Sequence, residues 1–321
     1  MSQKLQLSAG YQLPERYSIV EVIENYRDAV SEVYFPWLNI PDGRGVSVRY
    51  EADQYLMERE LHQLAQMGIK LHLLLNANCY GKNALSPEFA QNVESMLNFL
   101  TEKFSLSGIT TTSLFVARLC KKKFPSLEVR ASVNMNIASR QAMEYVSDYF
   151  DGFYVARSVN RDIEAVKALR IPGKKLYLLA NSGCLNGCPA RHFHDSLVAH
   201  EEEIALEDNA FGFGGICRDF LAGPDGPEKF FKHTNFVRPE DLNLYENYFD
   251  MIKLATRTNP DPVQVMEAYL SGCYRGNLPA LLEPDHSGVL FPVILENSLL
   301  PAEFGTNRQK QDWCKICSVK T

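Results

Sequence analysis

The sequence has no apolar run of 18 residues, so we expect no membrane-spanning helix. Its opening residues contain no apolar signal core, and we therefore expect a cytoplasmic protein. It also has no surplus of basic residues: 33 Lys and Arg stand against 39 Asp and Glu, which gives a net charge of −6. This balance argues against broad binding to nucleic acid or to an anionic membrane surface.

Several catalytic motifs are missing. No G-x-G-x-x-G or G-x-x-x-x-G-K-[ST] follows a predicted strand, which argues against a dinucleotide or nucleoside triphosphate site. The absence of G-x-S-x-G and H-E-x-x-H removes two familiar kinds of hydrolase machinery. A C-x-x-x-C-x-x-C motif is also missing, because its third thiol would fall at Arg191. A radical S-adenosylmethionine enzyme is therefore disfavoured.

Short apolar runs do alternate with amphipathic segments through residues 1–183. Strands are predicted at residues 5–7, 33–35, 69–75, 109–114, 127–133, 153–155 and 175–179. Helices are predicted between them, and Ser86 with Pro87 is typical of a helix start. Such alternation favours a parallel sheet with helices outside, and six or seven units predict a (β/α)₈ TIM-type barrel. The last strands are predicted at residues 236–237 and 251–254.

The alternation of predicted strands and helices is interrupted twice, and these interruptions predict the domain organisation. The barrel is expected to cover residues 1–258, with a cysteine-containing insertion at about residues 182–235. Residues 259–321 are proline-rich and irregular. We expect this extension, which ends in a C-x-x-C pair, to close over the barrel mouth.

Polar side chains follow several predicted strands. In a parallel barrel such positions meet at the carboxyl-terminal mouth, where active sites lie. Asparagine is also a common turn residue, so repetition at successive strand ends counts for more than any single position. We predict that the asparagines orient substrate and that the arginines bind a carboxylate or phosphate; these residues are Asn76, Asn78, Asn134, Asn181, Arg157 and Arg257.

Five cysteines lie outside the regular units. Cys184 and Cys188 form C-x-x-x-C, Cys217 follows 29 residues later, and Cys314 and Cys317 form a C-x-x-C near the C-terminus. Thiolates suit both zinc and iron–sulfur clusters, whose sites take four ligands. Five unrelated thiols is the alternative. The order of a strand, a C-x-x-x-C pair and distant cysteines fits a cluster at the edge of a cavity.

Histidines follow the first cysteine pair closely. His192 and His194 are predicted to donate a proton or bind substrate; the simpler alternative is an ordinary polar face beside the metal site. Cys79 is expected at a strand end facing the cavity, whereas Cys120 is expected to be structural.

Two stretches resemble a known family. They are the strand-to-cysteine transition NSGC…C (residues 181–188) and the run FVRPEDLNLYENYFDMIKLATR (residues 236–257). The second run resembles a signature of the collagenase-like peptidase superfamily, in which a strand ending in K-I-E/A-G-R follows R-D or E-D. Here Lys253 to Arg257 is the counterpart, and Thr256 stands where that pattern has glycine. The resemblance covers roughly residues 1–260.

The superfamily includes ubiquinone-biosynthesis accessory proteins for oxygen-independent hydroxylation and RNA-hydroxylation factors. The resemblance implies a barrel with a 4Fe-4S cluster, with Cys184 and Cys188 as two ligands. Cys217 and one of Cys314 or Cys317 are the expected remainder. It implies an oxygen-independent hydroxylase, or a related redox enzyme, acting on a small organic or RNA-linked substrate. The alternatives are an iron–sulfur accessory subunit that serves a partner protein or electron donor, and a zinc-containing barrel hydrolase or peptidase.

Overall fold

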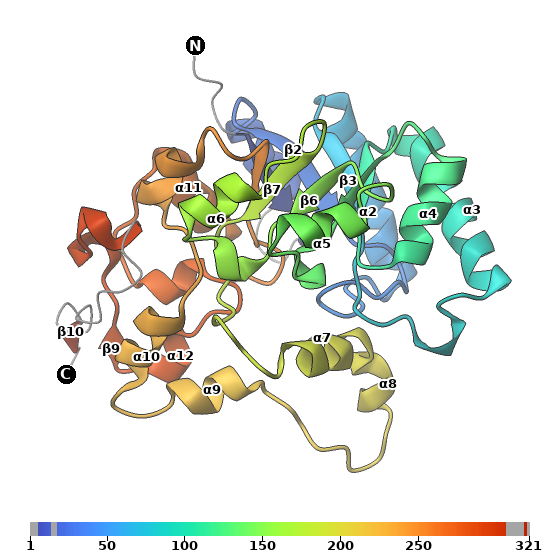
Figure 1. Ribbon diagram of the computed structural model, residues 1–321. Coiled ribbons are helices and arrows are strands. Elements are labelled where there is room, and N and C mark those ends of the chain that lie inside the picture. The colour runs from blue at the N-terminus through green and yellow to red at the C-terminus, as the bar shows by residue number, and fades with distance from the viewer. Residues whose placement is uncertain (1–5, 14–17, 306–317, 320–321) are drawn as a thin grey trace.

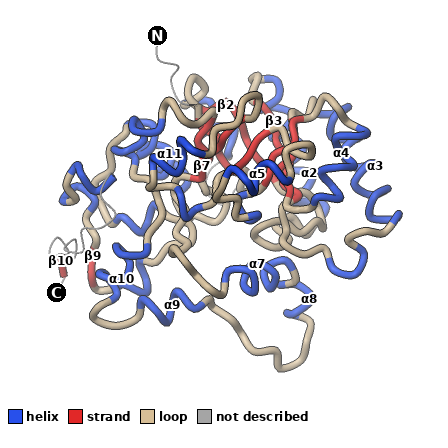
Figure 2. The backbone as a smooth tube through the Cα atoms, in the orientation of Figure 1, coloured by secondary structure: helices blue, strands red, loops and turns tan. Residues whose placement is uncertain are grey.

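A closed barrel of eight parallel strands lies at the centre of the protein, in a computed structural model that describes residues 6–13, 18–305 and 318–319 (Figures 1 and 2). Each strand pairs with the next along the chain, and the eighth pairs with the first. The strands are β1 (Leu7–Gly10), β2 (Val30–Phe35), β3 (Lys70–Leu75), β4 (Gly108–Thr111), β5 (Glu128–Ala131), β6 (Gly152–Tyr154), β7 (Lys175–Leu179) and β8 (Met251–Lys253). The predicted (β/α)₈ barrel is confirmed.

Helices cover the outside of this barrel, and short 3₁₀ helices follow several strands. The outer helices are α1 (Ile19–Asn25), α2 (Glu51–Gln66), α3 (Pro87–Phe104), α4 (Leu114–Lys123), α5 (Arg140–Tyr145), α6 (Ile163–Ala168) and α11 (Pro262–Ser271). The 3₁₀ helices between them are η1 (Gly81–Asn83), η2 (Val133–Met135) and η3 (Arg157–Val159). No helix in the described part of the chain is long and apolar enough to cross a membrane.

Local chemistry explains why α3 begins where the sequence predicts. The Ser86 side chain accepts a hydrogen bond from the backbone N–H of Phe89 at 3.0 Å, and Pro87 occupies the first turn. Val93, Leu97 and Leu100 then recur on one face and are buried. Helix α3 thus packs one apolar stripe against the barrel and leaves its other face in water.

Two irregular segments interrupt or follow the barrel. Between β7 and β8 the chain forms α7 (Arg191–Ala199), α8 (Glu201–Ala205), α9 (Ile216–Leu221), α10 (Gly226–His233) and η4 (Pro239–Tyr245). Figure 1 shows α7, α8 and α9 as an arm below the barrel. After α11 come η5 (Leu278–Leu281), α12 (Ser287–Leu290), η6 (Asn297–Leu299), η7 (Ala302–Gly305) and the strand pair β9 (Val293–Ile294) and β10 (Ser318–Val319).

The strand predicted at residues 236–237 was wrong. Phe236 and Val237 are buried, but they run as a loop beside the end of β7, where the Val237 N–H donates to the Ala180 carbonyl at 2.8 Å. The residues that follow this loop form the 3₁₀ helix η4. There Arg238 binds both carboxylate oxygens of Asp241, at 2.7 and 2.9 Å, and this pair fixes a tight turn.

The C-terminal extension does reach the barrel mouth. Ser182 and Glu283 form a parallel bridge, and the His286 ring lies 2.8 Å from the Gly183 carbonyl oxygen. The backbones approach so closely that a Cβ on Gly183 would stand 2.0 Å from the Pro284 carbonyl oxygen. Only glycine fits there, which explains its place in the NSGC stretch.

Candidate functional site at the barrel mouth

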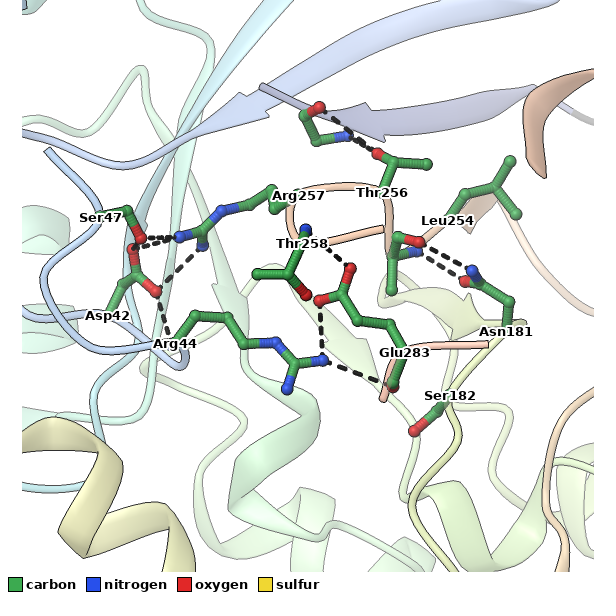
Figure 3. Close-up of polar contacts among 12 residues, drawn as sticks. Asp42, Arg44, Ser47, Asn181, Ser182, Leu254, Thr256, Arg257, Thr258 and Glu283 are labelled. Atoms are coloured by element: carbon green, nitrogen blue, oxygen red, sulfur yellow. Dashed lines mark hydrogen bonds and ion pairs between the residues drawn. The ribbon is translucent and has the colours of Figure 1, made fainter. Parts of the chain in front are cut away.

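An ion pair ties the loop after β2 to the end of β8 (Figure 3). The two terminal nitrogens of Arg257 lie 3.0 and 2.8 Å from the carboxylate oxygens of Asp42, and Ser47 also accepts from Arg257. Both side chains are nearly buried, at 6% and 0% exposed. Arg257 was predicted to bind a substrate anion, but its guanidinium already has an internal carboxylate.

A second ion pair brings the C-terminal extension into the mouth. Arg44 lies 2.7 Å from a carboxylate oxygen of Glu283, whose other oxygen accepts from the Thr258 N–H at 3.1 Å (Figure 3). The sequence prediction missed Asp42, Arg44 and Glu283. Arg44 and Glu283 are 239 residues apart, and no local pattern signals such a partner.

Asn181 was predicted to orient substrate, and the structure contradicts this. It is fully buried, and its side-chain amide donates to the carbonyls of Ala255 and Leu281 at 2.7 and 2.9 Å. Its amide oxygen accepts from the Ala255 N–H at 2.6 Å. All its bonds go to the backbone, so Asn181 fastens β7 to the chain after β8.

The other three predicted asparagines do lie around the mouth. Asn76 and Asn134 converge on Gly43, where an added Cβ would stand 2.9 and 3.1 Å from their amide nitrogens. Asn78 instead donates to Asp195 of α7 at 3.4 Å. Asn76 and Asn134 therefore remain the candidates for contact with a substrate.

Arg157 is a buried cation with neutral partners. Its guanidinium donates to Ser182 at 2.9 Å and to Asn134 at 3.1 Å, and it forms no ion pair with any described residue. Burial lowers the pKa of Arg157, while the nearby Cys184 opposes that shift. A guanidinium in this position favours an anion at the mouth.

Cys184, which neighbours Arg157, also interacts electrostatically with Cys217. Burial, and then the charge of Cys184, raises the pKa of Cys217, and Cys188 adds to the effect. Burial lowers the pKa of Arg44, but Glu283 and then Cys184 raise it more, so it rises overall. The half-buried thiols of Cys184 and Cys188 therefore both act electrostatically on Cys217. Cys184 also interacts with Arg44 and Arg157. The remaining predicted ligands, Cys314 and Cys317, lie outside the described residues.

A single metal ion and a 4Fe-4S cluster place different demands on their ligands. Within residues 6–13, 18–305 and 318–319, no three His, Cys, Asp or Glu side chains are close enough to hold one metal ion. Zinc needs all its ligands around a single centre. In a 4Fe-4S cluster each thiolate binds a different iron, so the sulfur atoms stand farther apart.

The two predicted histidines differ in position, although both are on α7. His192 is exposed to solvent. The ring of His194 packs against Phe213 with the ring centroids 5.6 Å apart, and it adjoins Gly215 on the same side as the Cys217 sulfur. Only His194 is thus beside the thiols.

The barrel interior contains charged groups that the sequence prediction did not assign. Arg130 forms an ion pair with Glu32: its Nη1 donates to Oε1 at 2.8 Å, and its Nη2 lies 2.8 Å from Oε2. The Lys253 ammonium lies over the rings of Tyr34 and Tyr154, 3.6 and 5.2 Å from their centroids. Burial, and then the charges of Arg257 and Arg130, lower the pKa of Lys253 to about 7. Its place at the start of the K-L-A-T-R stretch is the signal that could have identified it.

Comparison with known proteins gives a related sequence and a related fold. No protein-family model matches the chain. The uncharacterized protease MJ1657 of Methanocaldococcus jannaschii is 25% identical over 251 residues, which cover 75% of this chain and 72% of that protein. The solved structure of the U32 peptidase Mk0906 has a TM-score of 0.56 at 15% identity and covers 78% of this chain and 91% of that one. At this identity the second likeness shows the fold alone.

Proposed function

We propose that the chain is a member of the collagenase-like (U32) peptidase superfamily, which its likeness to the protease MJ1657 and its barrel fold support. We further propose that it is an enzyme whose barrel mouth binds a 4Fe-4S cluster through cysteine thiolates. The proposed reaction is an oxygen-independent hydroxylation, or a related redox step, on a small organic or RNA-linked substrate. The observation that carries the proposal is the buried Arg157 guanidinium, which has the Cys184 thiol beside it and is paired with no carboxylate of the described residues.

The charges at the mouth support a resident anion. Cys184, Cys188 and Cys217 would bind the cluster, with a fourth ligand from Cys314 or Cys317. Such a cluster with four thiolates is negatively charged, so Arg157 and Arg44 would compensate it. When bound, it supplies one-electron redox chemistry.

The remaining mouth residues would handle the substrate. Asn76 and Asn134 present amide groups around Gly43, where they can orient a polar substrate by hydrogen bonds. Lys253 titrates near neutral pH, which suits a group that accepts a proton from the substrate. His194, beside Cys217, is the candidate to return a proton.

Alanine variants of the ligand cysteines test the proposal. We expect Cys184→Ala, Cys188→Ala and Cys217→Ala each to lose most of the iron and sulfide of the wild-type protein, because a missing thiolate leaves one iron without its protein ligand. Iron and acid-labile sulfide are measured after anaerobic purification. Cys273→Ala, at an exposed position, is the matched control and should keep both. Full retention of the cluster in Cys217→Ala would remove Cys217 from the ligand set.

Neutralising Arg157 should lower the midpoint potential of the cluster. The loss of a buried positive charge favours the less reduced, less negative state, so we expect Arg157→Gln to shift the potential down by on the order of tens of millivolts. An anaerobic redox titration followed by electron paramagnetic resonance measures this shift. Arg140→Gln, at an exposed helical pair, should leave the potential unchanged. The same potential in Arg157→Gln and the wild type would contradict an anion beside Arg157.

A further inference from the structure

A cysteine, a histidine and a glutamate meet beside the mouth, separate from the three proposed ligand thiols. Cys79 follows β3, His200 follows the last turn of α7, and Glu203 lies in α8. The Nδ1 atom of His200 lies 2.8 Å from a carboxylate oxygen of Glu203. The imidazole also neighbours the side chain of Cys79, and the two groups interact electrostatically. Since Nδ1 contacts Glu203, Nε2 is the ring nitrogen that remains available to Cys79.

Further contacts locate the Cys79 sulfur beside this ring. The backbone N–H of Gly81 donates to Sγ of Cys79 at 3.4 Å. The Cε1 atom of His200 lies 3.7 Å from the position that a Cβ on Gly81 would occupy. The histidine therefore lies against the tight loop that carries the thiol. Cys79 is only half-buried, so a substrate can reach it.

Contacts along α7 and α8 hold this arrangement in place. Asn78, next to Cys79, donates to Asp195 at 3.4 Å, and Arg191 donates to Asn136 at 2.7 Å. At the other end, Arg49 lies 2.8 Å from Glu202. The arm is thus attached to the loops after β2, β3 and β5, and these attachments bring His200 to Cys79.

The electrostatics of the pair favour its charged form. The interaction with the His200 side chain, and then the hydrogen bond from Gly81, lowers the pKa of Cys79. Reciprocally, the interactions with the side chains of Cys79 and Glu203 raise the pKa of His200. A thiolate beside an imidazolium that a carboxylate orients is the arrangement that activates a cysteine nucleophile.

We propose that Cys79, His200 and Glu203 form a second reactive centre, which takes an acyl group from an ester or thioester substrate. The Cys79 sulfur attacks the carbonyl carbon, and the carbonyl π electrons move to oxygen. Collapse of this adduct expels the alkoxide or thiolate, which takes the proton from Nε2 of His200. Water then attacks the acyl-cysteine and gives its proton to His200. The carboxylic acid leaves, and the Cys79 thiolate and the imidazolium are restored.

Two reagents test this centre in the full-length protein. p-Nitrophenyl acetate should release a burst of about one equivalent of p-nitrophenolate and leave one acetyl group on the Cys79 peptide, as mass spectrometry would show. Iodoacetamide should alkylate Cys79 at pH 6.5 about threefold or more faster in the wild type than in His200→Gln, because the thiolate fraction falls in the variant. Glu203→Gln should give a smaller decrease. Cys273, which is exposed, is the internal reference and should react equally in every variant.

Each measurement has an outcome that overturns the proposal. If Cys79 is alkylated equally fast in the wild type and in His200→Gln, the histidine does not activate the thiol. If Cys79 is alkylated rapidly but carries no acetyl group, the centre is not an acyl acceptor. If the Cys79→Ser variant is still acetylated on another residue, that residue, and not Cys79, is the acyl acceptor.

Discussion

Replacing Arg130 by methionine should destabilise the protein by about 3–5 kcal/mol, the largest effect expected of any single substitution here. Arg130 is 3% exposed and Glu32 is fully buried inside the barrel. The variant leaves the Glu32 carboxylate in the core with a hydrogen bond from the Ser8 hydroxyl at 2.7 Å, and it also removes the 2.9 Å contact between Arg130 and Glu128. Breaking a buried pair costs more than the pair itself contributes, because the remaining charge has lost its partner. Urea unfolding at pH 7 measures the change.

Two controls separate this cause from loss of packing. Arg140→Met removes an arginine from an exposed helical pair with Glu144 and should cost no more than about 0.5 kcal/mol. The double variant Glu32→Leu with Arg130→Met removes both charges, and it should be more stable than Arg130→Met alone. If the single variant loses less than about 1 kcal/mol, or the double variant regains nothing, the buried charge is not what stabilises the barrel.

Replacing Lys253 by methionine, unlike Arg130→Met, should stabilise the protein below neutral pH. The pKa of Lys253 is lowered to about 7 in the folded protein, whereas an unfolded chain binds that proton up to a pH of about 10.4. Between these values the unfolded state binds more protons, so wild-type stability rises with pH. Below pH 7 the free-energy cost of burying the charged Lys253 ammonium is fully present. We expect Lys253→Met to be more stable by about 2–4 kcal/mol at pH 6, with the difference vanishing near pH 10.

Urea unfolding at pH 6, 8 and 10 measures this pH dependence. Lys70→Met, at the exposed start of β3, controls for the loss of a surface lysine and should change stability by no more than about 0.5 kcal/mol. A stability difference between Lys253→Met and wild type that stays the same at all three pH values would contradict the lowered pKa. A buried lysine that lowers the stability of the fold is expected to act on substrate, so Lys253→Met should also lose activity.

The sequence predicted the barrel because its signal is local. Apolar runs and helical periodicity repeat unit by unit, and strand β7 has the predicted bounds, Lys175–Leu179. The loop at Phe236 was mistaken for a strand because its two residues are apolar. They are apolar because they are buried, although they do not pair in the sheet. Apolar character alone cannot distinguish burial from pairing in a sheet.

The mouth was only partly predictable. Asn76 follows β3 and Asn134 follows β5, two strands further round the barrel, and the βα repeat alone brings both to the same mouth. Asn181 shares that position, but its amide is used by two backbone segments that are distant in sequence. The Arg44–Glu283 pair depends on how the extension packs, which no local pattern records. The 4Fe-4S assignment remains a prediction.

The iron and sulfide content of the anaerobically purified full-length protein tests the central claim most directly. The proposed cluster predicts a brown protein with about four irons and four acid-labile sulfides per chain, and little zinc. A colourless protein that contains zinc and no iron would contradict it.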